Sequence, residues 1–185
     1  MMRRFRAWPV LLLLPLMAQA QWMDRDGSPL PDESWRKSDG NFGAALQIAT
    51  EAEFGRFNEE WHSTKVEHTP SLATTDLAHR GDLIRVLLVY SGCAASSAEP
   101  ARCLATLHLR VTKPDGTVYA DIPDLMLAGE QPPTAGVVQL SPASLQIRFE
   151  PEDPLGRYRI EAWLSDPTQD AELQLSDSIR LTATN

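Results

Sequence analysis

The sequence predicts a mainly β protein, an antiparallel sandwich of two sheets preceded by one short strand-helix element. From Pro70 onward, apolar residues alternate with polar ones at a period of two, which is the pattern of half-buried strands. The runs are separated by turn-forming segments such as Lys113-Pro-Asp-Gly116 and Pro151-Glu-Asp-Pro154. Seven or eight runs in about 115 residues favour a sandwich, with a small barrel as the alternative.

Residues 1–20 have the three parts of an export signal. Arg3, Arg4 and Arg6 precede an apolar run that ends at Met17, and small residues follow at Ala18 and Ala20. The run is shorter than the roughly 20 residues of a membrane-spanning helix, so we expect cleavage after Ala20 rather than an uncleaved anchor. Removing three arginines and no acidic residue takes the net charge from -8 to -11. The protein is therefore expected in the periplasm or outside the cell, with no transmembrane segment after cleavage.

Residues 21–43 are rich in Asp, Ser, Pro and Gly and follow neither strand nor helix periodicity. This composition predicts a flexible or loosely docked N-terminal arm. Its two isolated tryptophans, Trp22 and Trp35, are candidate contact residues for a partner.

A strand-helix element is expected over residues 44–71, at the start of a single domain that spans residues 44–185. Ala44 to Thr50 fits a short strand, and Thr50 with Glu53 three residues later fits a helix capping box. The aromatic residues Phe54, Phe57 and Trp61 then fall on one helical face. We expect this aromatic face to pack on the sandwich, with a ligand platform as the alternative.

The strands of the sandwich follow in order along the chain. Leu83 to Tyr90 is apolar on both faces except at Arg85, which is typical of a central strand. From Cys103 to Thr112 the odd positions are apolar or small, and the even positions from Thr106 onward are polar, so one face is expected to be buried and the other wet. In the last strand Asp177 falls on the inward face and suggests a bulge. The remaining alternating runs are 145–150, 157–164 and 173–181.

Cys93 and Cys103 are the two cysteines of the chain, and an exported protein with an even number usually oxidises them. We expect a structural disulfide that pins the loop between two strands. A reactive or metal-binding pair is the alternative, but neither a Cys-x-x-Cys spacing nor a ligand cluster accompanies the two residues.

Two segments carry a resemblance to a known fold. Asp153-Pro-Leu-Gly156-Arg-Tyr158 resembles the Asp-x-x-Gly-x-Tyr corner of immunoglobulin-like and fibronectin-type domains, and residues 111–119 resemble a hairpin common in bacterial members. The resemblance covers about residues 72–183 and implies that the Tyr158 hydroxyl bonds back to the corner's backbone. The inter-sheet cysteine pair and core Trp of antibody domains are missing, so it implies the architecture and not antibody-like recognition.

Motifs for enzymatic chemistry are absent from the sequence. It contains no Gly-x-Ser-x-Gly and no phosphate-binding or dinucleotide-binding glycine pattern. A small carboxylate-based hydrolase is the enzymatic alternative, because the chain has 25 acidic residues. It is disfavoured because a small sandwich offers little cleft to hold a catalytic pair.

His62 and His68 lie close to acidic residues in the sequence, at Glu59, Glu60 and Glu67. A carrier of a ligand or divalent metal that uses these groups is a second alternative function. The histidines lack the spacing of a zinc site, so we expect no metal site and no cofactor.

The function expected from these observations is that of a non-enzymatic envelope or periplasmic interaction module. Its partner is expected to be another envelope protein or a glycan, and the acidic charge disfavours nucleic acid. Trp163 is a further contact candidate beside Trp22 and Trp35, because strand alternation places it outward with Arg157, Arg159 and Glu161. Cover of Trp163 by the strand-helix element is the alternative.

Overall fold

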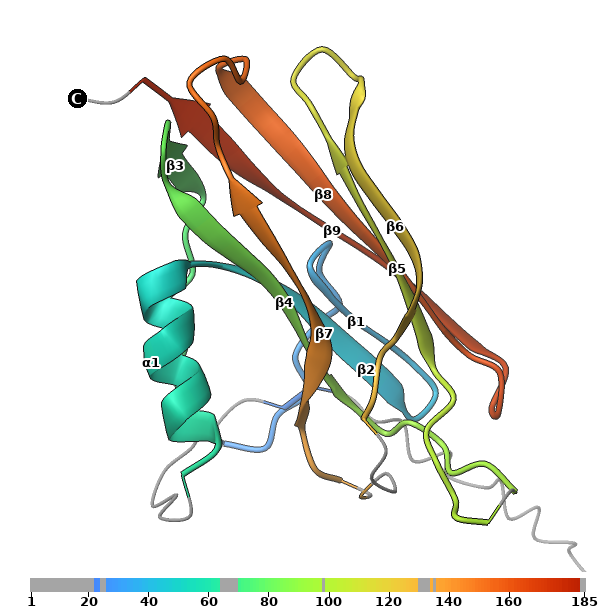
Figure 1. Ribbon diagram of the computed structural model, residues 1–185. Helices are drawn as coiled ribbons and strands as arrows, with labels where there is room; N and C mark the ends of the chain where they lie inside the picture. The colour runs from blue at the N-terminus through green and yellow to red at the C-terminus, as the bar shows by residue number, and fades with distance from the viewer. Residues whose placement is uncertain are drawn as a thin grey trace, which may run out of the picture.

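The computed structural model describes residues 22–23, 26–63, 70–97, 99–129, 134 and 136–183. It is mainly β, as expected, with two facing sheets and one helix (Figure 1). The expected signal segment, residues 1–20, lies outside the described residues. In the described part of the chain, no helix is long and apolar enough to cross a membrane.

One sheet has four antiparallel strands in the order β1-β2-β4-β7. These strands are β1 (Arg36–Asp39), β2 (Phe42–Thr50), β4 (Leu83–Ser91) and β7 (Gln139–Arg148). The central position of β4 agrees with its apolar residues on both faces.

The other sheet has five strands in the order β3-β9-β8-β5-β6, and Figure 1 shows it lying across the first. Its neighbours are antiparallel except for β3, which pairs parallel with β9. The strands are β3 (Leu77–His79), β5 (Thr106–Thr112), β6 (Val118–Met126), β8 (Gly156–Asp166) and β9 (Ala171–Thr182).

The core lies between the two sheets and follows the predicted alternation. In β8 the inward residues Tyr158, Ile160, Ala162 and Leu164 are all buried, and those between them are more exposed. The bulge expected at Asp177 is wrong, because β8 and β9 pair in unbroken register with Asp177 opposite Ile160. The carboxylate stays in the regular strand by accepting a bond of 2.7 Å from the Ser178 N–H, and burial raises its pKa.

Helix α1 (Glu51–Trp61) begins where the capping pattern predicts, and the Thr50 hydroxyl accepts a hydrogen bond from the Glu53 N–H. The helix contacts β2 and β4. Phe57 is buried, as expected for the aromatic face. Arg85, the polar exception in β4, donates to the Glu51 carboxylate at 2.7 and 3.1 Å, so its charge is paired with the helix.

The N-terminal segment differs from the expected arm over residues 21–43. Strand β1 begins at Arg36, and a two-residue loop containing Gly40, at φ +56°, joins it to β2. Upstream, the Ser34 carbonyl accepts from Ser176 of one sheet, and the Trp35 carbonyl accepts from Leu46 of the other. Periodicity missed β1 because its four residues, Arg-Lys-Ser-Asp, include no apolar side chain.

Candidate functional site

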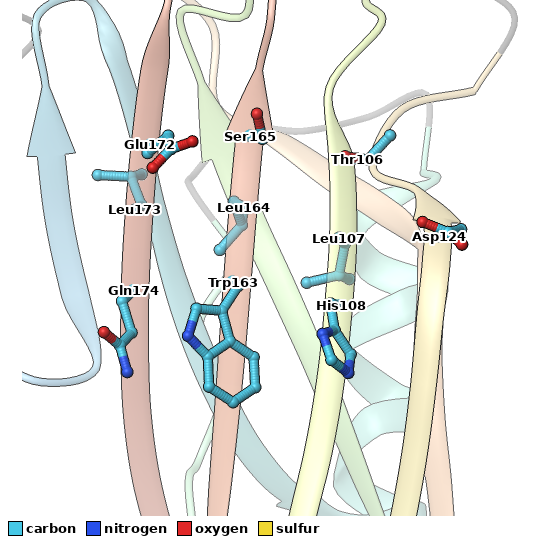
Figure 2. A pocket seen from close by; sticks show the side chains of 10 residues that line it. All are labelled: Thr106, Leu107, His108, Asp124, Trp163, Leu164, Ser165, Glu172, Leu173 and Gln174. Atoms are coloured by element: carbon cyan, nitrogen blue, oxygen red, sulfur yellow. The ribbon is translucent and has the colours of Figure 1, made fainter.

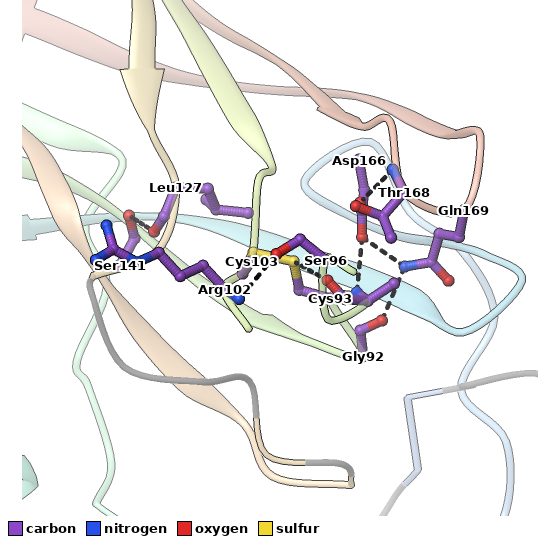
Figure 3. Close-up of a disulfide and its surroundings, with 11 residues drawn as sticks. Gly92, Cys93, Ser96, Arg102, Cys103, Leu127, Ser141, Asp166, Thr168 and Gln169 are labelled. Carbon is purple, nitrogen blue, oxygen red and sulfur yellow. Dashed lines mark hydrogen bonds between the residues drawn. A yellow bond between two sulfur atoms is a disulfide. The ribbon is translucent and has the colours of Figure 1, made fainter. Parts of the chain in front are cut away.

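The predicted disulfide is confirmed: Cys93 and Cys103 are bonded to each other, and both are buried (Figure 3). Next to it the fully buried Asp166 carboxylate accepts from the Ala94 N–H at 2.8 Å and from the Gln169 side-chain amide at 2.6 Å. These bonds fasten the disulfide loop to the turn between β8 and β9. They therefore fix the end of β8 that carries the site described next.

The site is a groove of about 460 Å³ on the outer face of the five-stranded sheet (Figure 2). Its floor includes Thr106 of β5 and Ser165 of β8, which pair with each other across the two strands. Small side chains at both positions leave the hollow open. Leu107, Leu164 and Leu173 also line it, although they belong to the core layer beneath.

Trp163 borders the groove between two cross-strand partners, His108 on β5 and Gln174 on β9. Figure 2 shows the three side chains next to one another on neighbouring strands, with the indole ring seen broadside. The ring centroids of Trp163 and His108 are 5.0 Å apart, and the Arg110 guanidinium carbon lies 5.5 Å from the indole centroid. Trp163 is half-buried.

Helix α1 does not cover Trp163, because it contacts β2 and β4 of the other sheet. Trp163 lies on β8 and faces away from the core residues Ala162 and Leu164 on either side of it. The expected outward orientation is therefore what the structure has, and the described part of the strand-helix element does not cover Trp163.

Asp121 on β6 binds the two basic side chains next to Trp163, Arg110 and His108. Its carboxylate accepts two bonds of 3.2 Å from Arg110 and a further bond from the His108 ring. These bonds, the Arg110 ones first, lower the pKa of Asp121. On the same face Arg159 pairs with Glu161 at 3.0 Å. The charges around the indole are thus already paired within the sheet.

The groove is flanked by two carboxylates from the strands on either side, Asp124 of β6 and Glu172 of β9. Asp124 has φ +56° and lies where the pairing of β5 with β6 shifts register, between Leu107 and Leu109. A bulge of this kind re-aims a side chain, and Asp is among the residues that tolerate positive φ. The described residues that line the groove include no Lys and no Arg.

The other candidate tryptophans lie apart from this groove, and each uses its indole N–H within the N-terminal segment. Trp22 donates to the Lys37 carbonyl at 3.2 Å, and its indole nitrogen lies against Gly43. Trp35 donates to the Glu33 carboxylate at 2.8 Å, and the Arg36 guanidinium lies over its ring. Neither residue lines the groove. In the structure both help to attach the N-terminal segment.

The candidate histidines are only partly described. His62 ends helix α1, and its ring Nδ1 lies 2.8 Å from the Asn58 carbonyl oxygen. His68 lies outside the described residues. Within the described ranges no three His, Cys, Asp or Glu side chains are grouped so as to hold a metal ion. A carrier function based on His62 and His68 stays a prediction.

Sequence reasoning found Trp163 but missed its neighbours His108, Asp124, Glu172 and Gln174. Strand alternation identifies residues on one face of one strand, and so it identified Arg157, Arg159 and Glu161. Neighbours on other strands depend on the pairing of β5, β8 and β9, which alternation does not contain.

No family model and no curated protein matches the chain. Among solved structures it resembles a family 123 glycoside hydrolase from Clostridium perfringens, with TM-score 0.45 and 10% identity over 78% of this chain and 28% of that one. A Niemann-Pick type C2 protein from the Japanese carpenter ant gives TM-score 0.35 and 9% identity over 57% and 79%. A beta-glucosidase from Listeria innocua gives TM-score 0.35 and 7% identity over 89% and 19%. At these scores the likenesses carry no argument about function.

Proposed function

We propose that the protein is an exported, non-enzymatic interaction module that binds another envelope protein or a glycan in the groove beside Trp163. The observation that carries the proposal is a half-buried indole, in contact with His108 and Arg110, on the border of a groove on the outer face of the sheet. An aromatic side chain that its neighbours hold in place next to a groove is a typical anchor residue for a binding partner.

The sheet edges support binding at the face rather than by strand addition. Strand β6, one edge of the five-stranded sheet, contains Pro123, and the edge strand β7 contains Pro142. The other two edges are the short strands β1 and β3. Proline and short, charged edges prevent a partner strand from pairing.

We infer that the sandwich is immunoglobulin-like. Strands β2, β4 and β7 correspond in order to A, B and E of that fold, and β6, β5, β8 and β9 correspond to C′, C, F and G. The Tyr158 hydroxyl at the start of β8 donates to the Pro154 carbonyl at 3.0 Å. This bond supports the tyrosine corner that the sequence resemblance implies.

Export to the periplasm or the exterior is supported by the disulfide and by the signal-like residues 1–20. Disulfides persist in oxidising compartments, and the cysteines of this chain are both consumed in one bond.

The carboxylates that line the groove support binding over hydrolysis. Asp124 and Glu172 lie on β6 and β9, which are three strand spacings apart, or about 14 Å between backbones. The carboxyl groups of a glycosidase pair are about 5 to 9.5 Å apart, which these two side chains would reach only by extending towards each other across the groove. The described carboxyl group whose pKa is raised, Asp177, does not line the groove.

Photo-crosslinking tests the proposal. A benzophenone side chain placed at Gln174, in the groove, is expected to capture a partner from the native envelope. The matched control is the same group at Arg157, which lies on the same sheet face outside the groove. Equal capture at both positions, or capture at neither, would contradict the proposal.

A further inference from the structure

We infer that the ligand of the groove is an uncharged oligosaccharide, with one sugar ring stacked on Trp163. The inference rests on the proposed function, and it narrows the partner to one chemical class. It is carried by three features of the site: the indole platform, the kind of polar groups beside it, and the sign of the charges that line it.

The platform is the broad face of Trp163. A pyranose ring presents C–H groups on one side, and these pack on an aromatic face, which carries negative charge density. Figure 2 shows the indole broadside, with Gln174 on one side and His108 on the other. The His108 ring is tilted by 36° to the indole, so the two rings form a shallow aromatic corner and not a flat sheet.

The polar groups beside the platform match sugar hydroxyls. Each sugar hydroxyl both donates and accepts, and it is best satisfied by groups that offer both functions or by carboxylates. Gln174 offers an amide, Thr106 and Ser165 offer hydroxyls, and Asp124 and Glu172 offer carboxylate oxygens. A few fixed polar groups around an apolar contact are what orient a small ligand.

The charges exclude an acidic sugar. The groove contains the carboxylates of Asp124 and Glu172, and the described residues that line it include neither Lys nor Arg. The nearest basic side chains, His108 and Arg110, are both bonded to Asp121. A uronate, sulfate or phosphate in the groove would meet two like charges without a free cation to offset them.

The size of the groove favours a short saccharide over a folded protein. About 460 Å³ lies within the range of about 300 to 1,000 Å³ that is typical of small-molecule sites. A protein interface buries about 800 Å² on each partner around an apolar centre. Here charged side chains next to the indole form ion pairs, Arg110 with Asp121 and Arg159 with Glu161.

The test is a titration of the purified protein with neutral hexasaccharides: β-1,4-linked glucose, xylose, mannose and N-acetylglucosamine, and α-1,4-linked glucose. Polygalacturonate and a sulfated glucan serve as anionic counterparts. We expect a neutral hexamer to bind and to change the tryptophan fluorescence. Trp163→Ala should weaken that binding by at least about tenfold and Gln174→Ala by about fivefold, while Trp163→Phe should retain part of it.

The control variant is Trp61→Ala, which removes a half-buried tryptophan on α1, outside the groove, and should leave the affinity unchanged. Preferred binding of an anionic polymer, or equal binding by the Trp163→Ala variant, would overturn the inference. If no neutral hexamer binds but a group at Gln174 crosslinks specifically to a protein, the sugar ligand is overturned and the proposed function is left intact. If no hexamer binds and no partner is crosslinked, both the proposed function and the sugar ligand are overturned. Cleavage of a bound hexamer would overturn the proposal that the protein is not an enzyme.

Discussion

The two outer faces of the sandwich carry the same chemical arrangement with different surroundings. On the four-stranded sheet, Glu51 binds Arg85, whose guanidinium carbon lies 4.8 Å from the Phe54 ring centroid. On the five-stranded sheet, Asp121 binds Arg110, which lies 5.5 Å from the Trp163 ring centroid. In the first case a helix supplies both the acid and the aromatic ring and so covers the sheet. In the second case all three residues come from the sheet itself, and no helix in the described part of the chain covers this face.

The largest difference is expected between the removal of a buried aromatic residue of the covering helix and the removal of Trp163. Phe57 of α1 is 3% exposed, and Phe57→Ala should lower the free energy of unfolding by about 3 kcal/mol through the cavity it leaves. Trp163→Ala should lower it by less than about 1 kcal/mol, because the half-buried ring adjoins a groove that is already open. Urea unfolding of both variants measures this, and equal losses would mean that Trp163 is a structural residue.

The disulfide should matter more to the groove than to the helix. Replacing Cys93 and Cys103 together by alanine should lower the free energy of unfolding by about 2 to 3 kcal/mol, as expected for a loop of this length. Hydrogen exchange should rise first near Asp166, whose bond to Ala94 depends on the position of the loop. Faster exchange in α1 before this region would contradict the coupling of the disulfide to the groove.

Replacing Arg85 and Arg110 in turn should again affect the two faces differently. Arg85→Met should lower the free energy of unfolding by about 1 kcal/mol, because the pair with Glu51 is partly buried against the helix. Arg110→Met should leave the unfolding midpoint unchanged but alter the fluorescence of Trp163, which it flanks. Thermal unfolding and emission spectra give the two readings. A lower unfolding midpoint for Arg110→Met would show that the arrangement of Arg110, Asp121 and Trp163 also stabilises the fold.

The smallest effect concerns pH. The hydrogen bonds from Arg85 lower the pKa of Glu51 below 4.5, so the stability from this pair is present above that value and is lost as pH falls through the folded pKa. Glu51→Gln should therefore flatten the acid side of the stability curve slightly. Asp121→Asn should leave the curve unchanged, because its carboxylate lies on an exposed surface. Acid titrations of the two variants, monitored by circular dichroism, check both expectations.

Much of the fold could be predicted from local pattern, because burial alternates strictly in strands such as β5 and β8. The helix start at Thr50 and the disulfide were predictable for the same reason, since each depends on neighbours in sequence. Strand β1 was not, because its pairing with β2 depends on backbone bonds and not on apolar side chains. The groove was predictable only at Trp163, because Asp124 reaches it through a bulge that no sequence pattern marks.

The attachment of the N-terminal segment to β9 sets the order in which the molecule can fold. Ser34 bonds to Ser176, and the Asp39 carboxylate accepts from the Glu172 N–H, 133 residues further along the chain. Contacts between residues so far apart form late, since the loop between them must close first. The seam that β1 makes with β9 therefore cannot close until the last strand, β9, has been synthesised.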